Sequence, residues 1–423
     1  MQKSDDSTMP PRADARGEPD ESLPLTRRNL LRSAAAATGG ALLGSALSPP
    51  ASAAGYQGGE GSMMFMPGHS MIGAHTEALG APADHEVRYR EFDLTFDIVE
   101  HELLPRVRFP VFAFNKRVPG PVFRVQENDW IKVNATNKTE VMHTIHWHGV
   151  DLIYTMDGVP MVTQDPIHPE ETFVYRFQAR PAGTRFYHCH WSTPLHMMSA
   201  LHGAFIIDSP DDPVRAQFPY TRDYVLVLES FDTVFTRKQM NAVLGGMKRV
   251  NKLMAMGKLD PATHGFFRDY DEMLAAIEAG WRPPYAMGNS EALVPDPNFF
   301  AINGKCYPAT EKIGIVRDEF IRIRLINGGF LVHHMHLHGH QFWHVAEDGN
   351  PIPQPLRKNT IEVGPGKTQD IIVLGNNPGF WTFHDHDVRR VMNNGVYPGG
   401  MLTMLVYEDM EDPPYVPSIA INE

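Results

Sequence analysis

The chain has 423 residues, of which 42% are hydrophobic and 10% aromatic, so it is long and apolar enough for two or three domains with buried cores. A formal net charge of −12 argues against nucleic acid or an anionic membrane surface as a partner. Two cysteines, Cys189 and Cys306, allow one disulfide by count, but a metal-ligand role for Cys189 would leave Cys306 as a free, buried thiol.

The first 53 residues have the three parts of a twin-arginine export signal. Arg27 and Arg28 precede an Ala/Gly/Leu-rich stretch, and residues 51–53 supply a small-residue cleavage site. This route carries folded, often cofactor-loaded proteins, so we expect the signal to be removed and the mature protein to be periplasmic or extracellular. No other apolar run reaches transmembrane length, so no membrane span is expected, and residues 54–87 are expected to form an N-terminal arm.

Residues 88–232 are expected to form a first β-sandwich domain. This stretch is dense in short Val/Ile/Phe/Tyr segments that are interrupted by Pro and Gly. The segments 92–98 and 172–177 alternate apolar and polar residues as half-buried strands do. Many short strands separated by turns favour a sandwich.

Residues 296–410 repeat this scheme and are expected to form a second sandwich. Strands are expected at 321–326 and 380–383. The intervening stretch 233–295 changes in composition and is expected to be a partly helical linker, with a helix at 273–278. Residues 411–423 are expected to be a C-terminal tail.

Four segments each carry two histidines separated by one residue. The pairs are His146 and His148, His188 and His190, His336 and His338, and His384 and His386. Neutral imidazole is the commonest protein ligand for copper or zinc. Residues i and i+2 of a strand point to the same face, so each pair presents two imidazoles side by side. Four pairs predict a multinuclear metal site, and their distribution, two in each half of the chain, indicates an internal duplication.

One pair differs from the others because a cysteine separates its histidines. Cys189 stands between His188 and His190, so its side chain is expected on the opposite face of the strand. A metal bound by this thiolate would lie behind the cluster and would be joined to it by two covalent Cys-His routes. The arrangement predicts electron transfer between two metal sites.

Five motifs occur in order along the chain. They are Asn115–Pro121, His143–Gly149, Met156–Pro160, Tyr187–His190 and His333–His340. Together they resemble the multicopper oxidases, specifically the two-domain laccase-like branch. The resemblance implies an all-β fold of two cupredoxin-like Greek-key sandwiches, with one type 1 copper and a trinuclear type 2/type 3 copper cluster. It also implies one-electron oxidation of a small reducing substrate, coupled to four-electron reduction of dioxygen to water.

The resemblance assigns the eight paired histidines to the trinuclear cluster and a second set of residues to the type 1 copper. A type 1 site needs a thiolate, two histidines and an optional weak axial methionine, and the first domain supplies His143, Cys189 and His196. The fifth residue after His196 is Leu201, which is preferred for the axial place. Met197 and Met198 remain alternatives.

The second domain is not expected to hold a type 1 copper. Asp385 stands where the cysteine would be, and no histidine follows at the place of the second nitrogen ligand. His333 and Met401 occupy the remaining type 1 positions and are interpreted as remnants used for packing.

Asp157 is the candidate catalytic residue. It matches a family acid close to the cluster, where a carboxylate can relay protons to bound oxygen. A purely structural role as the first residue of an Asp-Gly turn is a serious rival. Asp387, next to His386, is a weaker candidate for the same role.

A chain with only two such domains also has an expected assembly. In the related two-domain enzymes the cluster forms between the first domain of one subunit and the second domain of its neighbour, so the resemblance implies a homotrimer with interfacial clusters.

Three functions compete. They are a laccase-like oxidase of phenols, aromatic amines or metal ions, a copper-containing nitrite reductase, and a copper-resistance protein or cuprous-ion oxidase. The oxidase is favoured because nitrite reductases lack the full set of four His-x-His pairs. A protein that only binds copper would not need the Cys-His connection.

Overall fold

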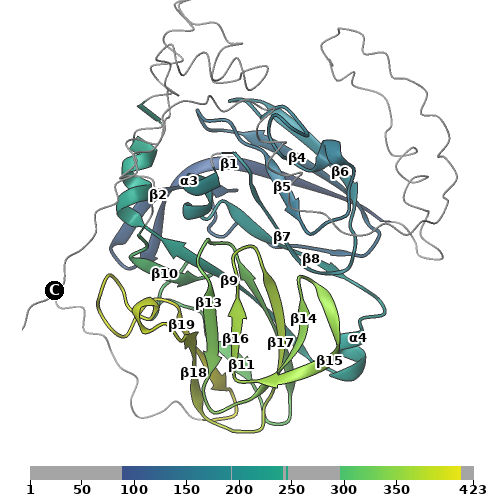
Figure 1. The fold of residues 1–423 in the computed structure, drawn as a ribbon, viewed down its shortest axis with the longest axis vertical. Helices are drawn as coiled ribbons and strands as arrows, with labels where there is room; N and C mark the ends of the chain where they lie inside the picture. Colours follow the sequence, from purple (N-terminus) through teal and green to yellow (C-terminus); the bar gives the residue numbers. More distant parts are fainter. Residues whose placement is uncertain (1–87, 192, 242–243, 246–295, 411–423) are drawn as a thin grey trace, which may run out of the picture. The chain divides into compact units, whose positions relative to one another are not determined.

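The computed structural model describes residues 88–410 except residue 192, residues 242–243 and residues 246–295. The expected export signal, N-terminal arm, C-terminal tail and helix at 273–278 lie outside the described residues. Figure 1 shows the described strands, coloured from purple for the first to yellow for the last.

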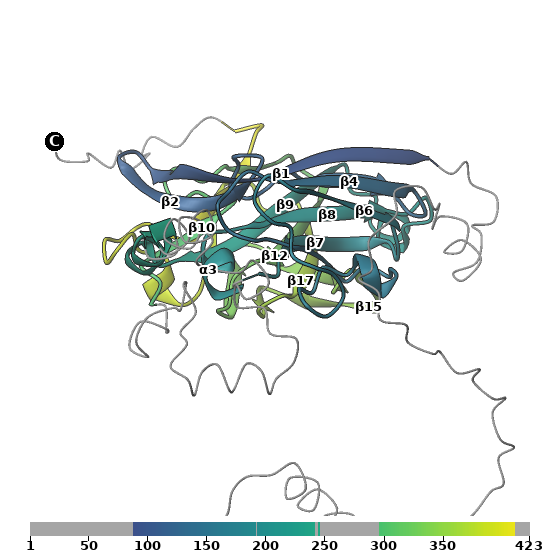
Figure 2. The ribbon, with the colours of Figure 1, turned by 90° about the horizontal axis from the view of Figure 1, so that it is seen from above.

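The first sandwich consists of two four-stranded sheets. In spatial order, one sheet contains β2 (Val107–Phe114), β1 (Tyr89–Leu104), β4 (Trp130–Asn137) and β6 (Thr172–Gln178). The other contains β3 (Phe123–Gln126), β8 (His202–Asp208), β7 (Gly183–Cys189) and β5 (Ile145–His148). In the view of Figure 2, β1, β4 and β6 run side by side, as their pairing requires.

Alternation in the sequence explains how these sheets pack. Along β4, buried residues alternate with partly exposed ones from Ile131 to Asn137, so one face of the strand enters the core. Phe96 of β1, Phe177 of β6 and Phe205 of β8 are fully buried in one apolar cluster between the sheets. Cys189 at the end of β7 belongs to the same cluster, so its thiol points into the core.

The second sandwich has a six-stranded and a five-stranded sheet. The larger contains β10 (Phe299–Ile302), β9 (Arg222–Phe231), β12 (Phe320–Asn327), β17 (Thr368–Leu374), β14 (Phe342–Glu347) and β15 (Asn350–Lys358). The smaller contains β11 (Ile313–Ile315), β19 (Leu402–Tyr407), β18 (Phe380–Asp385), β13 (His333–Leu337) and β16 (Thr360–Val363).

Strand β9 belongs to the second sandwich, although it precedes the boundary expected at residue 232. It pairs in parallel with β12, just as β1 pairs in parallel with β4 in the first sandwich. The second sandwich therefore begins one strand earlier than the sequence indicated. The apolar alternation of a strand does not specify which sheet it joins.

Short helices connect some of the strands in the described part of the chain. They are η1 (Tyr154–Met156), α3 (Thr193–Met198), α4 (Pro213–Gln217) and η4 (Val388–Arg390). Asp212 caps α4 by accepting a hydrogen bond from the Val214 amide. A further helix begins at residue 233, where Asp232 accepts from the amides of Val234 and Phe235.

One buried arginine contacts residues of both sandwiches. Arg324 of β12 donates to both carboxylate oxygens of Asp223 in β9 and to Thr184 of β7. No helix within the described part of the chain is long and apolar enough to cross a membrane. The predicted all-β fold of two cupredoxin-like sandwiches is confirmed.

Candidate metal centre

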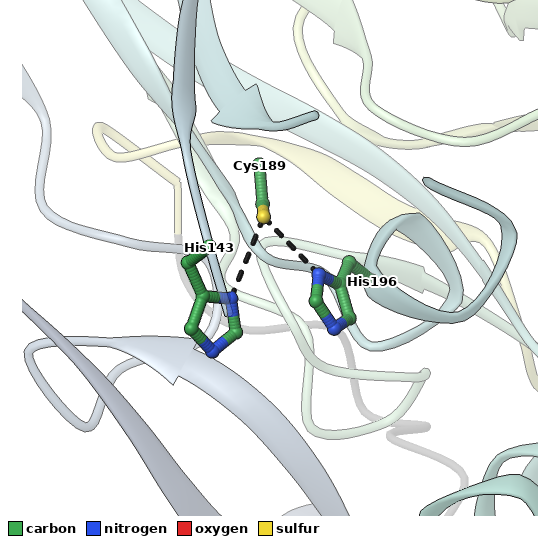
Figure 3. A group of neighbouring side chains, drawn as sticks. All are labelled: His143, Cys189 and His196. Carbon is green, nitrogen blue, oxygen red and sulfur yellow. Dashed lines mark hydrogen bonds between the residues drawn. The ribbon is translucent and has the colours of Figure 1, made fainter. Parts of the chain in front are cut away.

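A buried cysteine and two buried histidines meet at the end of β7. Cys189 Sγ lies 3.1 Å from Nδ1 of His196 and 3.5 Å from Nδ1 of His143, as Figure 3 shows. His196 comes from α3, and His143 lies just before β5, bridged to Ile167. None of these three ligand-type side chains is exposed to solvent. The structure thus brings together the three residues expected at the type 1 site.

The protonation chemistry of this group suits a metal ion. Burial lowers the pKa of His196 to about 3, and burial followed by the proximity of His196 holds the pKa of His143 well below its usual value. Both imidazoles are therefore neutral at pH 7, which is the form that binds metals. Burial raises the pKa of the Cys189 thiol to about 12, so its proton has to leave when a metal binds. One thiolate with two imidazoles is a donor set that fits copper.

Thr139 fixes the orientation of His143. Its hydroxyl donates to Asn137 Oδ1 at 2.9 Å and lies 2.8 Å from His143 Nε2. The hydroxyl therefore accepts from the His143 Nε2–H, which leaves Nδ1 unprotonated and directed at Cys189. Thr139 is a functional residue that the sequence analysis missed, because no motif distinguishes it.

Aromatic rings pack against both histidines. Phe96 stacks on His143 with ring centroids 4.4 Å apart and an interplanar angle of 9°. Phe112 contacts His196 edge to face at 4.6 Å. Packing of this kind locks the rotamers of the ligands, so the pocket is preorganised.

Two residues near the type 1 group compete for the axial place. Leu201 and Met198 are both buried in the apolar cluster that contains Cys189, whereas Met197 is partly exposed. The Cys189 amide donates to the Leu201 carbonyl at 3.0 Å, which keeps Leu201 next to the cysteine. Leu201 remains the residue expected at the axial place.

The first four paired histidines gather on the other face of the same sheet. His146 and His188 are directly opposite in the β5–β7 register, and Cys189 is opposite Ile145. The His146 ring lies 5.3 Å from that of His188 and 5.8 Å from that of His190, centroid to centroid. The donor atoms of His146, His148 and His188 all lie within 4.8 Å of one another. We call His146, His148, His188 and His190 the first histidine set.

Burial keeps the imidazoles of His148 and His188 neutral as well. It lowers the pKa of His148 to about 4, with the proximity of His146 as the next cause. Burial also holds the pKa of His188 well below its usual value. Neutral imidazoles are the ligands that a copper cluster requires.

Asp157 contacts the first histidine set at His146. The Nδ1 of His146 lies 2.8 Å from the Asp157 carbonyl oxygen and 3.2 Å from its carboxylate Oδ1. An Nδ1–H that donates to the carbonyl leaves Nε2 free for a metal. Gly158 adopts a φ of +81°, and a Cβ there would lie 1.8 Å from the Ile145 carbonyl oxygen. Asp157 therefore both precedes a glycine-dependent turn and contacts a cluster histidine.

The other four paired histidines form a second histidine set, on β13, β18 and the residues that follow them. Its members are His336, His338, His384 and His386. His336 and His384 are opposite in the β13–β18 register, and the Nε2 atoms of His338 and His384 are 3.0 Å apart. His338 and His386 are exposed to solvent. A polar cavity of about 410 Å³ lies beside His336.

No close group of metal-binding side chains in the described residues combines members of the two histidine sets. Within the described parts of the chain, the groups of metal-binding side chains whose donor atoms lie within 4.8 Å of one another all belong to the first sandwich. Ring contacts join histidines of the second set to one another, at centroid distances of 4.9 Å for His336 and His338 and 5.4 Å for His336 and His386. Each chain therefore presents two four-histidine surfaces.

Comparison with known proteins agrees with this geometry. Family models described as multicopper oxidase match residues 99–212 and residues 282–397. The chain belongs to the multicopper oxidase family. A blue copper oxidase structure from Nitrosomonas europaea is 32% identical, with a TM-score of 0.61, over 78% of this multicopper oxidase and 90% of that chain.

Two curated relatives are longer than this multicopper oxidase. Copper resistance protein A of Escherichia coli is 28% identical over 70% of this chain and 48% of its own length. Laccase-15 of Oryza sativa subsp. japonica is 28% identical over 62% of this chain and 38% of its own length. The chain thus spans about half the length or less of these relatives.

The second sandwich of this multicopper oxidase has a hydrogen-bond network where a type 1 site would be. His333 Nδ1 lies 2.6 Å from Asp385 Oδ2, and both side chains are fully buried. Arg390 contacts the same carboxylate, and Ser230 lies 3.2 Å from His333 Nε2. His333 therefore does more than pack. No sequence motif points to Arg390 or Ser230, because their proximity to His333 depends on the tertiary fold.

Asp387 is the weaker of the two proton-relay candidates. Asp387 pairs with Arg389, which holds the pKa of Asp387 at about 2 despite partial burial. A carboxylate with so low a pKa is a poor proton relay at neutral pH, which weakens this candidate.

Cys189 and Cys306 are both free and buried, so the disulfide that the count allowed is absent between them.

Proposed function

We propose that the protein is a laccase-like oxidase that takes single electrons from a small reducing substrate and reduces dioxygen to water. The observation that carries this proposal is the position of Cys189. Its thiol contacts His143 and His196 in the core, while the adjacent His188 and His190 belong to the first histidine set on the opposite face. One short segment thus joins a type 1 site to a cluster.

Copper bound at these residues, one type 1 ion and a trinuclear cluster, would supply one-electron transfer and the four-electron reduction of dioxygen. The chain supplies the connection, because Cys189 is bonded through the backbone to both histidines. It also supplies preorganisation, because Thr139 orients His143 and the Asp157 carbonyl orients His146. The side chain of Asp157 is 31% exposed and lies beside His146, where it can pass protons from solvent toward the first histidine set.

The cluster is proposed to form between subunits. Each histidine set provides four imidazoles, and the second set has two solvent-exposed members, His338 and His386. A ring of three chains would bring the first set of one subunit against the second set of the next. Twin-arginine export to the periplasm or beyond is part of the same proposal, because this route carries folded, metal-loaded proteins.

The substrate class is a phenol, an aromatic amine or a metal ion such as cuprous copper. A copper nitrite reductase is disfavoured because all four His-x-His pairs occur in this chain. A protein that only stores copper would have no use for the thiol between two cluster ligands. Oxidation of cuprous ion in copper resistance stays within the proposed chemistry.

Absorption spectroscopy and oxygen uptake on the copper-loaded protein test the proposal. We expect an intense blue thiolate-to-copper band and oxygen consumption when a phenol or cuprous ion is added. Cys189→Ser should abolish both. The matched control is Cys306→Ser, which removes the other buried thiol and should leave both unchanged.

A blue band that survives in Cys189→Ser would overturn the type 1 assignment. A blue protein that consumes no oxygen and instead reduces nitrite would replace the oxidase by the nitrite reductase.

A further inference from the structure

The two sandwiches place different side chains at one equivalent position. In the first, Cys189 is opposite Ile145, and its amide donates to the Leu201 carbonyl at 3.0 Å. In the second, Asp385 is opposite Met335, and its amide donates to the Met401 carbonyl, also at 3.0 Å. Asp385 therefore occupies the position of the type 1 cysteine.

A histidine precedes each of these strand pairs at the same distance. His143 lies two residues before Ile145, and His333 lies two residues before Met335. His143 faces the thiol of Cys189, whereas His333 Nδ1 lies 2.6 Å from Asp385 Oδ2. The second sandwich thus keeps one imidazole and replaces the thiolate by a carboxylate.

A cationic side chain lies where the first sandwich has its metal-binding pocket. Arg390 Nη1 is 3.2 Å from Asp385 Oδ2 and 3.3 Å from His333 Nδ1. The same nitrogen donates to the Val332 carbonyl oxygen. A guanidinium this close to both residues would repel a metal ion and supplies the positive charge that the buried carboxylate needs.

Every polar atom at the centre of this network has a partner. His333 Nδ1–H donates to Asp385 Oδ2, so its Nε2 is free to accept from the Ser230 hydroxyl at 3.2 Å. Hydrogen-bonded Ser, His and Asp side chains also form the catalytic triad of hydrolases. Ser230, however, is 3% exposed, so no substrate can reach its hydroxyl. The network is closed and suited to a structural task.

The carboxylate also ties together the backbone that carries the second histidine set. Asp385 Oδ1 accepts from the His334 amide at 3.3 Å and from the Asp387 amide at 3.0 Å. The His386 amide in turn donates to the His334 carbonyl at 2.8 Å. These bonds fix β13 relative to β18 and the residues after it, which are the segments that present His336, His338, His384 and His386.

We propose that Arg390, Asp385 and His333 form a permanent, metal-free anchor at the place that corresponds to the type 1 copper, and that this anchor positions the second histidine set to bind copper. Arg390 and Asp385 are positioning residues, because they act through the neighbouring histidines. The inference rests on the proposed function, since it assumes that the second set contributes to a copper cluster.

Arg390→Met tests the anchor, and Arg389→Met is its matched control. The side chain of Arg389 is 83% exposed and pairs with Asp387, whereas that of Arg390 is 13% exposed and reaches Asp385 as well as Asp387. We expect Arg390→Met to weaken copper binding at the cluster by about 10- to 100-fold, as loss of an outer partner of a ligand does elsewhere. Arg389→Met should bind copper like the parent protein.

Spectra separate a positioning role from general destabilisation. In Arg390→Met the blue band should persist, because the type 1 residues lie in the first sandwich, while the type 2 electron paramagnetic resonance signal and the type 3 absorption weaken or shift. Arg390→Lys should recover part of both, because it retains the charge. If Arg390→Met does not fold, Asp385→Asn gives the same comparison, since its amide oxygen still accepts from the backbone.

Cluster signals and copper affinity that are the same in Arg390→Met as in Arg389→Met would overturn the anchor. A parent protein that binds type 1 copper but shows no cluster signal would instead overturn the proposed function, and the anchor with it.

Discussion

Asn137 and Asn327 make the same hydrogen bonds in the two sandwiches. The side-chain amide of Asn137 donates to the carbonyls of Val141 and Ile167 at 2.6 and 2.9 Å, and its oxygen accepts from the amide two residues later. The side-chain amide of Asn327 donates to the carbonyls of Leu331 and Val363 at 2.7 and 2.8 Å, with the same acceptance two residues later. Each asparagine is buried and closes the turn before His143 or His333.

Replacement of these two asparagines should have equal effects on stability and unequal effects on colour. Each of Asn137→Ala and Asn327→Ala removes hydrogen bonds to buried backbone groups, so each should lower the free energy of unfolding by about 1–3 kcal/mol. Only Asn137→Ala should shift the blue band, because its turn carries Thr139 and His143. Urea unfolding and visible absorption measure the two effects, and an equal change of colour in both variants would contradict the assignment.

Thr139→Val should disturb the type 1 site. The substitution removes the oxygen that accepts from His143 Nε2–H, so we expect about 10- to 100-fold weaker type 1 copper binding. Thr144→Val is the matched control, because Thr144 is equally buried and its hydroxyl has no hydrogen-bond partner within the described part of the chain. Copper titration followed at the blue band distinguishes the two, and equal losses would show that Thr139 does not orient His143.

The copper-free protein should lose stability as the pH falls below about 6.5. Burial lowers the pKa of His196 to about 3 in the folded protein, whereas an unfolded histidine titrates near 6.5. Between these values the unfolded chain binds the extra proton, so stability falls with decreasing pH by up to about 1.4 kcal/mol per pH unit for this group.

Urea unfolding of the copper-free protein at pH 7 and pH 5 measures this slope. His143, whose pKa is also lowered by burial, adds to the slope. His196→Asn should have a shallower pH dependence than the parent chain. An identical slope would mean that His196 is accessible to protons in the folded protein.

Arg324→Met should destabilise the contact between the sandwiches. The side chain of Arg324 is 2% exposed and donates to Asp223 and Thr184, so its loss removes the buried ion-pair partner of Asp223 and a hydrogen bond to the first sandwich, at a cost of about 3 kcal/mol. Arg124 also pairs with Asp223 but is 42% exposed, so Arg124→Met should cost about 0–1 kcal/mol. Thermal or urea unfolding compares them, and similar losses would argue against a special role for Arg324.

The sequence was sufficient to predict the strands that carry the histidine pairs, because period-two alternation and His-x-His spacing both depend on local geometry. The resemblance to the multicopper oxidases implied one group of His143, Cys189 and His196, and the structure brings these three residues together. The matched spacing of Asn137 and Asn327 before their histidines is a signal of the repeat that was available but not used.

The remainder depended on contacts between distant segments. Ser230 reaches His333 from another sheet, and Arg390 of η4 reaches both Asp385 and the Val332 carbonyl just before β13. The sheet to which β9 belongs was equally hidden, because a run of alternating apolar residues suits either sandwich. Parallel pairing with β12 decides it, and that pairing is a property of the tertiary fold.

The place of β9 has a consequence for the order in which the protein folds. Its neighbours β10 and β12 follow the whole linker, so a growing chain exposes β9 without partners while residues 233–295 are made. An unpaired β9 exposes residues that are buried in the folded protein, such as Leu226 and Leu228, and such a strand is prone to aggregation. The first sandwich can close early, whereas the second has to wait until its last strands emerge, so chaperone binding during synthesis should concentrate on β9.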